Sequence, residues 1–257
     1  MIIEFFGLPF SGKTTISSKL KSFFLNKKKI SSYREIIFLH LYKLKKINFL
    51  EYEILKRIEY QREFGSDRYK ENFFIKIIRI FFLIIIDKKK IQKKIDELFE
   101  NCKNEYQDLL NFLSLKLNEN SDKSTYLNFD WIKHLIIGHS LASKYKNFSL
   151  LNSEGFFQIC ISLTIRTNMN FNDIKKYLSL CPDIDYVFAI ISDRKDKKRI
   201  LNFIKKRNKK FLFDRTFIKK FFYMIKSIKA LKNKNMVIGR ITSFNKIDDI
   251  FYSYLDH

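Results

Sequence analysis

The sequence contains few residues that turn or interrupt a folded chain. Only two prolines and six glycines occur among its 257 residues, and no stretch is rich in both glycine and serine. Flexible linkers between domains are usually built from such residues. Their scarcity, together with the absence of an internal repeat, predicts a single domain spanning residues 1–257.

Cysteines are also few. Cys102, Cys160 and Cys181 form an odd and widely spaced set without a CxxC pair. This pattern excludes a disulfide framework and a cysteine-rich zinc site. It is typical of a protein kept in a reducing compartment, so we expect a cytoplasmic location.

Long apolar runs are missing as well. The longest, IFFLIII at residues 80–86, is much shorter than the roughly 20 residues that cross a bilayer. Because basic residues flank it on both sides, we expect a helix buried in the protein, with a membrane-surface helix as the alternative. The N-terminus shows neither the basic start nor the cleavage site of a secretory signal. We predict no transmembrane segment and leave peripheral membrane contact open.

Acidic residues and arginines are scarce relative to lysine. The chain has 27 Asp and Glu against 50 Lys and Arg, of which 11 are Arg and 39 are Lys, and its formal charge is +23. Many Ile, Asn, Phe and Tyr residues accompany the lysines, the profile expected of an AT-rich coding sequence. We therefore predict no specific nucleic-acid partner, although the positive potential favours anionic partners. A homodimer stays open.

What the sequence does contain is a series of short apolar runs separated by helical patterns. The runs predict strands at residues 2–6, 30–34, 148–155, 184–191 and 235–242. Strands that alternate with helices are typical of parallel sheets, so the expected fold class is α/β with a five-stranded, parallel, doubly wound sheet. Residues 36–146 are helical in pattern and are expected to form an insertion between the second and third strands. Ligands of such sheets bind at the carboxyl edge.

The segment GLPFSGKT, residues 7–14, follows the first predicted strand directly. It matches the phosphate-loop pattern GxxxxGK[ST] at every specified position. In such a loop, backbone N–H groups hold phosphates, the lysine reaches the β and γ phosphates, and the hydroxyl residue binds Mg²⁺. The motif predicts a P-loop sheet with ATP and Mg²⁺ as cofactors. The residues expected to contact ATP are Gly7, Leu8, Pro9, Phe10, Ser11, Gly12, Lys13, Thr14 and Thr15, and Thr14 is also an expected metal ligand.

Both ends of the chain resemble the P-loop nucleoside and nucleotide kinases, particularly the thymidylate kinase and deoxynucleoside kinase branch. Besides the phosphate loop, the resemblance covers Arg34 with Glu35, the segment PDIDYVFAIIS at residues 182–192 and the helical pattern at residues 213–231. The segment LLNSEGFFQ, residues 150–158, resembles the DEG motif of kinase-like proteins from bacterial surface-polysaccharide gene clusters.

The resemblance implies a phosphotransferase that moves the γ-phosphoryl group of ATP to a small acceptor. The acceptor is a nucleoside or nucleotide, or a sugar or glycan precursor, and the sequence does not decide between them. Arg34 and Glu35 are expected to contact it, with Glu35 orienting its hydroxyl; the alternative for Glu35 is a solvated residue at a helix start. Glu154 is expected to hold Mg²⁺ through water, with a structural hydrogen-bonding role as the alternative.

Two arginines complete the expected site. Arg199 and Arg207 fall where such kinases have a mobile lid, and a guanidinium can bind phosphate oxygens through two hydrogen bonds. The alternative for both is a solvated helix face. The expected catalytic residues are Lys13, Glu35, Glu154, Arg199 and Arg207.

Three positions depart from the patterns that carry the resemblance. Phe10 stands where the loop often has a small residue, Ser153 replaces the aspartate of the DEG-like motif, and Ile36 stands where a proline is expected. The departures leave the acceptor, and activity itself, open. The rival interpretation is a non-kinase P-loop ATPase or nucleotide-dependent switch that acts at a nucleic-acid or membrane surface through its lysines.

Overall fold

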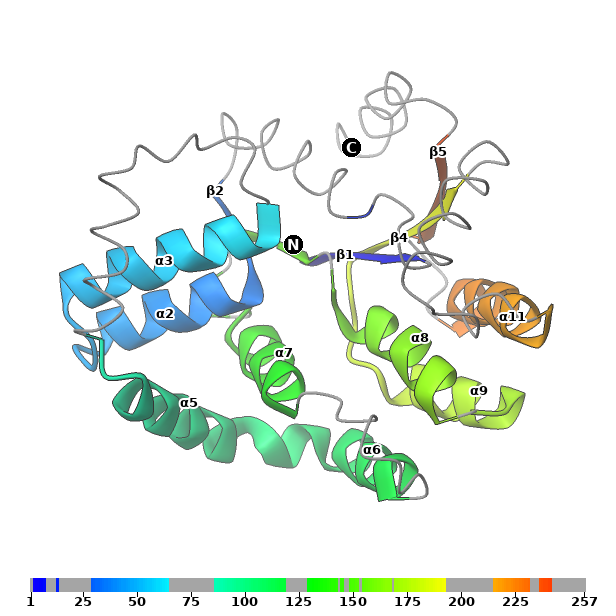
Figure 1. Ribbon diagram of the computed structural model, residues 1–257, viewed down its shortest axis with the longest axis horizontal. Helices are drawn as coiled ribbons and strands as arrows, with labels where there is room; N and C mark the ends of the chain where they lie inside the picture. Colours follow the sequence, from blue (N-terminus) through cyan, green and yellow to red (C-terminus); the bar gives the residue numbers. More distant parts are fainter. Residues whose placement is uncertain are drawn as a thin grey trace, which may run out of the picture. The chain divides into compact units, whose positions relative to one another are not determined.

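The structure is a computed structural model, and most of the residues that it describes are helical (Figure 1). The chain divides into two compact units, each of which is described by itself. The described residues are 2–7, 13, 29–64, 86–118, 129–142, 144–145, 148–152, 154–167, 169–192, 215–231 and 236–241.

One unit comprises Ile2–Ile16, Asp108–Leu127 and Asn152–His257. It contains a three-stranded, all-parallel sheet in which β4 lies between β1 and β5. Its strands are β1 (Ile2–Gly7), β4 (Tyr186–Ser192) and β5 (Met236–Ile241). Phe5 of β1 is in register with Phe188 of β4, and the two buried rings stack with their centroids 5.3 Å apart.

Helices pack against this sheet and against one another. The helices of this unit are α6 (Gln107–Asn118), α8 (Phe156–Arg166), α9 (Phe171–Leu180) and α11 (Arg215–Leu231). The ring of Phe6 in β1 lies 6.2 Å from Phe157 of α8 and 6.0 Å from Phe221 of α11. All three rings are buried, so a continuous aromatic core joins β1 to both helices.

The other unit comprises Ser17–Gln107 and Asn128–Leu151, together with Met1. Its strands are β2 (Lys29–Ser31) and β3 (Phe148–Asn152, with the unit boundary after Leu151), which pair in parallel over three residues. Its helices are α2 (Tyr33–Lys43), α3 (Phe49–Phe64), α5 (Lys88–Cys102), the short 3₁₀ helix η2 (Lys103–Tyr106) and α7 (Phe129–Ala142).

The core of this unit is formed where α2 meets α7. Ile36, Ile37 and Leu41 of α2 are fully buried. Gly138 of α7 allows the close approach, because a Cβ atom there would lie 2.4 Å from Cβ of Tyr33. The half-buried Trp131, the single tryptophan of the chain, also belongs to α7.

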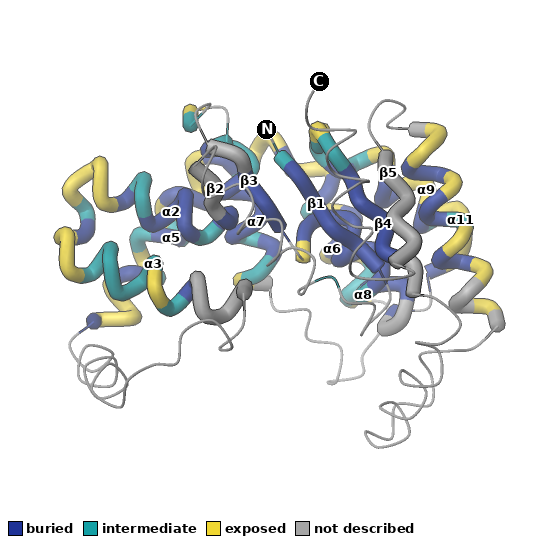
Figure 2. Tube along the Cα trace, turned by 90° about the horizontal axis from the view of Figure 1, so that it is seen from above, coloured by how far each residue is buried: buried dark blue, intermediate teal, exposed yellow. Residues whose placement is uncertain are grey.

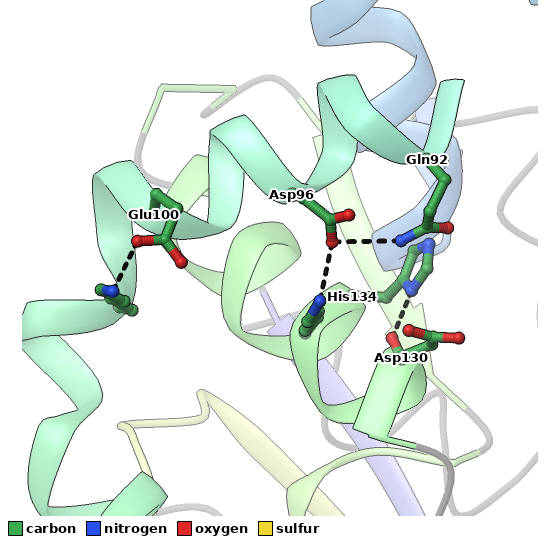
Figure 3. Close-up of polar contacts among 7 residues, drawn as sticks. Gln92, Asp96, Glu100, Asp130 and His134 are labelled. Atoms are coloured by element: carbon green, nitrogen blue, oxygen red, sulfur yellow. Dashed lines mark hydrogen bonds and ion pairs between the residues drawn. The ribbon is translucent and has the colours of Figure 1, made fainter. Parts of the chain in front are cut away.

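Polar contacts join α5 to α7 (Figure 3). Asp96 of α5 accepts hydrogen bonds from Lys133 Nζ of α7 at 2.7 Å and from Gln92 Nε2 at 3.2 Å. The hydrogen bond from Lys133 holds the pKa of the Asp96 carboxyl below its usual value. His134 of α7 is buried, and its Nδ1 bonds to the carbonyl of Asp130 one turn earlier.

The three cysteines are free and buried. Burial raises the pKa of the Cys102 thiol to about 11 and also raises the pKa of Cys160. The thiols of Cys102 and Cys160 therefore stay protonated near neutral pH, and all three buried cysteines pack as small apolar side chains.

The turn from α2 to α3 is closed by backbone hydrogen bonds. The N–H of Lys45 donates to Tyr42 O at 2.9 Å, and the N–H of Lys46 donates to Leu41 O at 2.9 Å. This pair of bonds is a Schellman motif, in which the residue after the C-cap adopts a left-handed conformation. Lys45 occupies that position with φ of 55°, where glycine is usually found.

The predicted fold class is wrong. A segment at each of the five predicted strands is extended. Among the residues that the structure describes, however, neither compact unit contains a five-stranded sheet: one holds three parallel strands and the other holds two. The helices of the predicted insertion, residues 36–146, are divided between the two units: α2, α3, α5 and α7 belong to the unit of β2 and β3, and α6 belongs to the unit of β1. The sheet of each unit is small, and helices predominate.

Other predictions are confirmed or fall outside the described residues. The described parts of residues 36–146 and of residues 213–231 are helical, as expected. Of residues 80–86, where a buried helix is expected, only Ile86 is described. Within the described ranges, no helix combines the length and the apolar composition needed to cross a bilayer.

The left-handed backbone conformation of Lys45 predicts how glycine at this position would change stability. Lys45→Gly should raise the free energy of unfolding by about 1 kcal/mol, because glycine adopts positive φ without the steric penalty of a Cβ atom. Urea unfolding measures this change. Lys43→Gly, two residues earlier in the last turn of α2, is the matched control and should destabilise by a similar amount. A loss of stability in Lys45→Gly would contradict the prediction.

Candidate functional site

Lys13, the lysine of the predicted phosphate loop, lies at the carboxyl end of β1. Its Nζ donates a hydrogen bond of 3.0 Å to the carbonyl of Gly7, the last residue of that strand. Burial lowers the pKa of Lys13 to about 8, and the negative charge of Glu154 acts in the opposite direction. The ammonium is therefore partly removed from water and lies within electrostatic reach of a carboxylate.

Gly7 is fixed from a second side. Its N–H donates to Oε1 of Gln158 at 3.1 Å, a buried contact that joins the end of β1 to α8. Both backbone groups of the glycine are thus engaged by side chains. The residue from which the predicted phosphate loop departs is therefore anchored on the unit's own core.

The strongest anchor between β1 and α8 is Glu4, which the sequence analysis did not single out. Glu4 lies in the middle of β1 and is fully buried. Its carboxylate accepts hydrogen bonds from the backbone N–H of Phe156 at 3.1 Å and of Phe157 at 3.4 Å. These N–H groups open α8 and have no partner within the helix. A negative charge at a helix N-terminus is also favoured by the helix dipole.

Gly155 makes the contact with Glu4 feasible. It is the N-cap of α8 and has no side chain to cap the helix. The side chain of Glu4, in strand β1, caps the helix instead. A Cβ atom on Gly155 would lie 2.0 Å from Cδ of Glu4 and 2.2 Å from Oε1. The glycine in the predicted Glu154–Gly155 motif thus serves helix capping. A glutamate inside an otherwise apolar strand was the one signal available in the sequence.

Glu154 is exposed and directly precedes this anchored glycine. The site therefore combines the half-buried ammonium of Lys13 at the end of β1 with the exposed carboxylate of Glu154 just before α8, whose charge acts on that ammonium. An ammonium suits phosphate oxygens, and a carboxylate suits Mg²⁺ either directly or through water. Among the described residues, no three His, Cys, Asp or Glu residues form a metal-binding group. Magnesium bound together with a nucleotide usually takes most of its ligands from phosphate and water.

Two predicted acceptor residues belong to the other unit and have structural partners there. Glu35 is buried and forms a capping box at the start of α2, in which its N–H donates to Ser32 Oγ at 3.2 Å and its Oε2 accepts from Ser32 N–H at 3.4 Å. Arg34 Nη1 lies 3.8 Å from Oε2 of the buried Glu59. Acceptor contact by Arg34 and Glu35 stays a prediction, and helix capping is what the geometry assigns to Glu35.

The remaining predicted site residues lie outside the described part of the chain. They belong to the predicted phosphate loop and the predicted lid, and Ser153 also lies outside the described residues. The predicted site residues in this group are Leu8, Pro9, Phe10, Ser11, Gly12, Thr14, Thr15, Arg199 and Arg207.

Comparison with known proteins adds no relative. No protein-family model matches the chain, and no curated protein matches it significantly. The resemblance to P-loop kinases therefore depends on the motifs quoted above.

The close approach of Gly155 and Glu4 predicts strong coupling between them. Gly155→Ala should destabilise the fold by about 2 kcal/mol, because the added methyl group overlaps the Glu4 carboxylate. In a Glu4→Ala background the same change should cost much less. A double-mutant cycle measured by urea unfolding tests this coupling. Additive effects of the two substitutions would show that the carboxylate does not limit the space at Gly155.

The lowered pKa of Lys13 predicts a gain in stability when its charge is removed. The unfolded lysine titrates near 10.5 and the folded one near 8, so burying the charged form destabilises the fold at all pH values below about 8. This penalty disappears as the pH rises from about 8 to 10.5. Because Lys13 is only half-buried, Lys13→Met should add about 1 kcal/mol at pH 7 after allowance for solvent screening.

Thermal and urea unfolding at pH 7 and pH 9.5 measure this effect. The gain from Lys13→Met should be larger at pH 7. Lys219→Met, at an exposed position of α11, is the control and should leave stability nearly unchanged. A loss of stability in Lys13→Met would mean that its bond to Gly7 outweighs the desolvation of its charge.

Proposed function

We propose that the chain is a P-loop phosphotransferase that uses ATP and Mg²⁺ to phosphorylate a small acceptor in the cytoplasm. In this reaction an acceptor hydroxyl or phosphate oxygen bonds to the γ-phosphorus of ATP, the bond to the bridging oxygen breaks, and ADP leaves. A hydroxyl acceptor also loses its proton. The acceptor classes are nucleosides or nucleotides, and sugars or glycan precursors.

The observation that carries the proposal is the placement of Lys13. A complete GxxxxGK[ST] match follows β1, and its lysine lies at the end of that strand with a lowered pKa and the carboxylate of Glu154 nearby. A lysine held by a backbone carbonyl can exchange that bond for a charged phosphate oxygen, which is the stronger acceptor. A bound phosphate would also stabilise the positive charge that burial disfavours.

The described residues fit a nucleotide with its metal. Lys13 would bind the β and γ phosphates, and Glu154 would orient water molecules around Mg²⁺, with Thr14 as the expected direct ligand. When bound, Mg²⁺ neutralises charge on the phosphates during transfer. Gln158 and Glu4 connect the end of β1 to α8. Lys13 follows that strand and Glu154 precedes that helix, and the charge of Glu154 acts on the pKa of Lys13.

Nucleotide binding tests the proposal directly. Lys13→Met should weaken Mg²⁺–ATP binding by about 10- to 100-fold, the range expected when a charge-assisted hydrogen bond is lost. Glu154→Gln should weaken binding of Mg²⁺–ATP but not of metal-free ATP, because its carboxylate attracts the metal and repels the phosphates. Isothermal titration calorimetry with and without Mg²⁺ measures both effects.

Matched controls separate the site from general charge effects. Lys175→Met removes a positive charge, as Lys13→Met does, and Glu105→Gln removes a negative charge, as Glu154→Gln does. Both controls lie at exposed positions, on α9 and η2, and both should bind ATP like the unchanged protein. Equal affinity in Lys13→Met and the unchanged protein would overturn the proposal.

The acceptor is identified by measuring ADP formation in the presence of nucleosides, nucleotides and sugars. Acceptor-dependent ADP formation is the expected result. Strong ATP hydrolysis that no acceptor changes would instead favour the P-loop ATPase or switch.

A further inference from the structure

The turn between α2 and α3 exposes an unusual concentration of apolar side chains. Seven large apolar side chains are exposed among the described residues, and four of them lie within residues 42–50. They are Tyr42, Leu44, Phe49 and Leu50, with exposed fractions of 36%, 49%, 62% and 49%. Single exposed apolar residues are common, but a cluster of them marks an interaction surface. We call residues 42–52 the α2–α3 tip.

Aromatic rings make the α2–α3 tip continuous. Tyr42 stacks on Tyr52 with ring centroids 5.1 Å apart, and the ring of Phe49 meets Tyr42 edge-on at 6.2 Å. Figure 2 shows exposed segments where α2 leads into α3. Side chains from the end of one helix and the start of the next thus form a single apolar surface.

The tip is held rigidly. The Schellman motif ends α2, and a capping box starts α3, in which Asn48 N–H donates to Glu51 at 2.7 Å and Glu51 N–H donates to Asn48 at 2.8 Å. Ile47, between the two motifs, is buried. The backbone is therefore fixed with Ile47 inward and its apolar neighbours outward, so little conformational entropy would be lost on docking.

Positive charge surrounds the apolar side chains. Lys43 and Lys45 are exposed at the tip, and Lys144 is exposed nearby. The pKa of His40 is lowered first by burial and then by the charges of Lys144, Lys46 and Lys43, so these lysines act on a common region. Lys46 is paired with Glu97 at 3.0 Å. Glu51, the one acidic residue among residues 42–52, caps α3. Lys43, Lys45 and Lys144 outnumber it and leave the rim with a net positive charge.

This combination selects one kind of partner. Nucleic acid would attract the lysines but gives no apolar environment to Leu44 and Leu50. A second copy in a two-fold contact would place the same positive rims against each other, which is unfavourable. The surface of an anionic bilayer supplies both an apolar layer and negative headgroups, and aromatic residues favour that boundary.

We propose that the α2–α3 tip docks on membranes that contain anionic lipids. Leu44, Phe49 and Leu50 enter the boundary between headgroups and acyl chains, and Lys43 and Lys45 contact the headgroups. The docking is peripheral and does not depend on whether the protein transfers a phosphoryl group.

Vesicle co-sedimentation of the full chain tests the apolar part. Binding should be strong on phosphatidylcholine vesicles that contain about 30% phosphatidylserine and weak on phosphatidylcholine alone. Replacing Phe49 and Leu50 together by serine should lower binding at least about tenfold, because two large apolar side chains no longer leave water. The control is Leu115→Ser on α6, which is 56% exposed and outside the tip, and it should bind normally.

Lys45→Gly tests whether positive charge at the tip contributes to membrane binding. The same variant excludes misfolding as the cause of weaker binding. Loss of one lysine near an anionic surface should lower binding about fivefold, while the relief of positive φ should stabilise the fold. A fall in binding with a rise in stability cannot arise from misfolding. Lys175→Gln on α9 is the charge-matched control.

A fluorophore shows whether the tip enters the bilayer. Because the three native cysteines are buried, a thiol introduced by Leu50→Cys can be labelled selectively with an environment-sensitive dye. Its emission should shift to the blue with phosphatidylserine vesicles, and the emission from a labelled Leu115→Cys protein should not.

Several outcomes would overturn the proposal. Equal binding to both kinds of vesicle, or binding that the tip substitutions leave unchanged, would exclude the α2–α3 tip as the contact. Sedimentation velocity that shows a dimer dissociated by the Phe49 and Leu50 substitutions would mean that a second copy covers the tip.

Discussion

The buried carboxylate of Glu4 holds one helix terminus against one strand, and the candidate site depends on that contact. A charge inside a protein is strongly unfavourable unless hydrogen bonds and opposite partial charges surround it. The first N–H groups of α8 provide both. In turn, Gly155 must lack a side chain because the Glu4 carboxylate occupies the space beside it. Glu154, whose charge acts on the pKa of Lys13, directly precedes this glycine. The backbone next to one of the two site charges is thus held by an interaction in which neither charge takes part.

The glycine pattern and the apolar runs could be interpreted from the sequence because they are local. GLPFSGKT marks the end of a strand by itself, and IDYVFAII is apolar enough to indicate a buried strand in isolation. The division of the five strands between two units could not be predicted, because it depends on which helices pack together. α6 lies between α5 and α7 in the chain, yet it belongs to the unit of β1.

The residues of the candidate site that belong to local motifs could also be predicted from the sequence, and those that depend on distant contacts could not. Lys13 and Glu154 belong to recognisable motifs, whereas Glu4 is an isolated acidic residue whose partners lie about 150 residues away in sequence. Glu35 shows the opposite difficulty. Ser32 and Glu35 fit the capping-box spacing as well as Arg34 and Glu35 fit a kinase pair, and only the hydrogen bonds show that the box is formed. When a local sequence pattern fits two different roles, only the contacts in the structure show which role its residues have.

The single tryptophan gives the two-unit organisation a spectroscopic consequence. Trp131 belongs to α7, so its fluorescence reports directly on the unit formed by α2, α3, α5 and α7. Far-ultraviolet circular dichroism instead averages the helices of both units. If the units unfold separately, the two signals change at different denaturant concentrations, whereas cooperative unfolding makes them coincide. An unmodified protein therefore carries its own probe of how strongly the unit that contains β1 is coupled to the other.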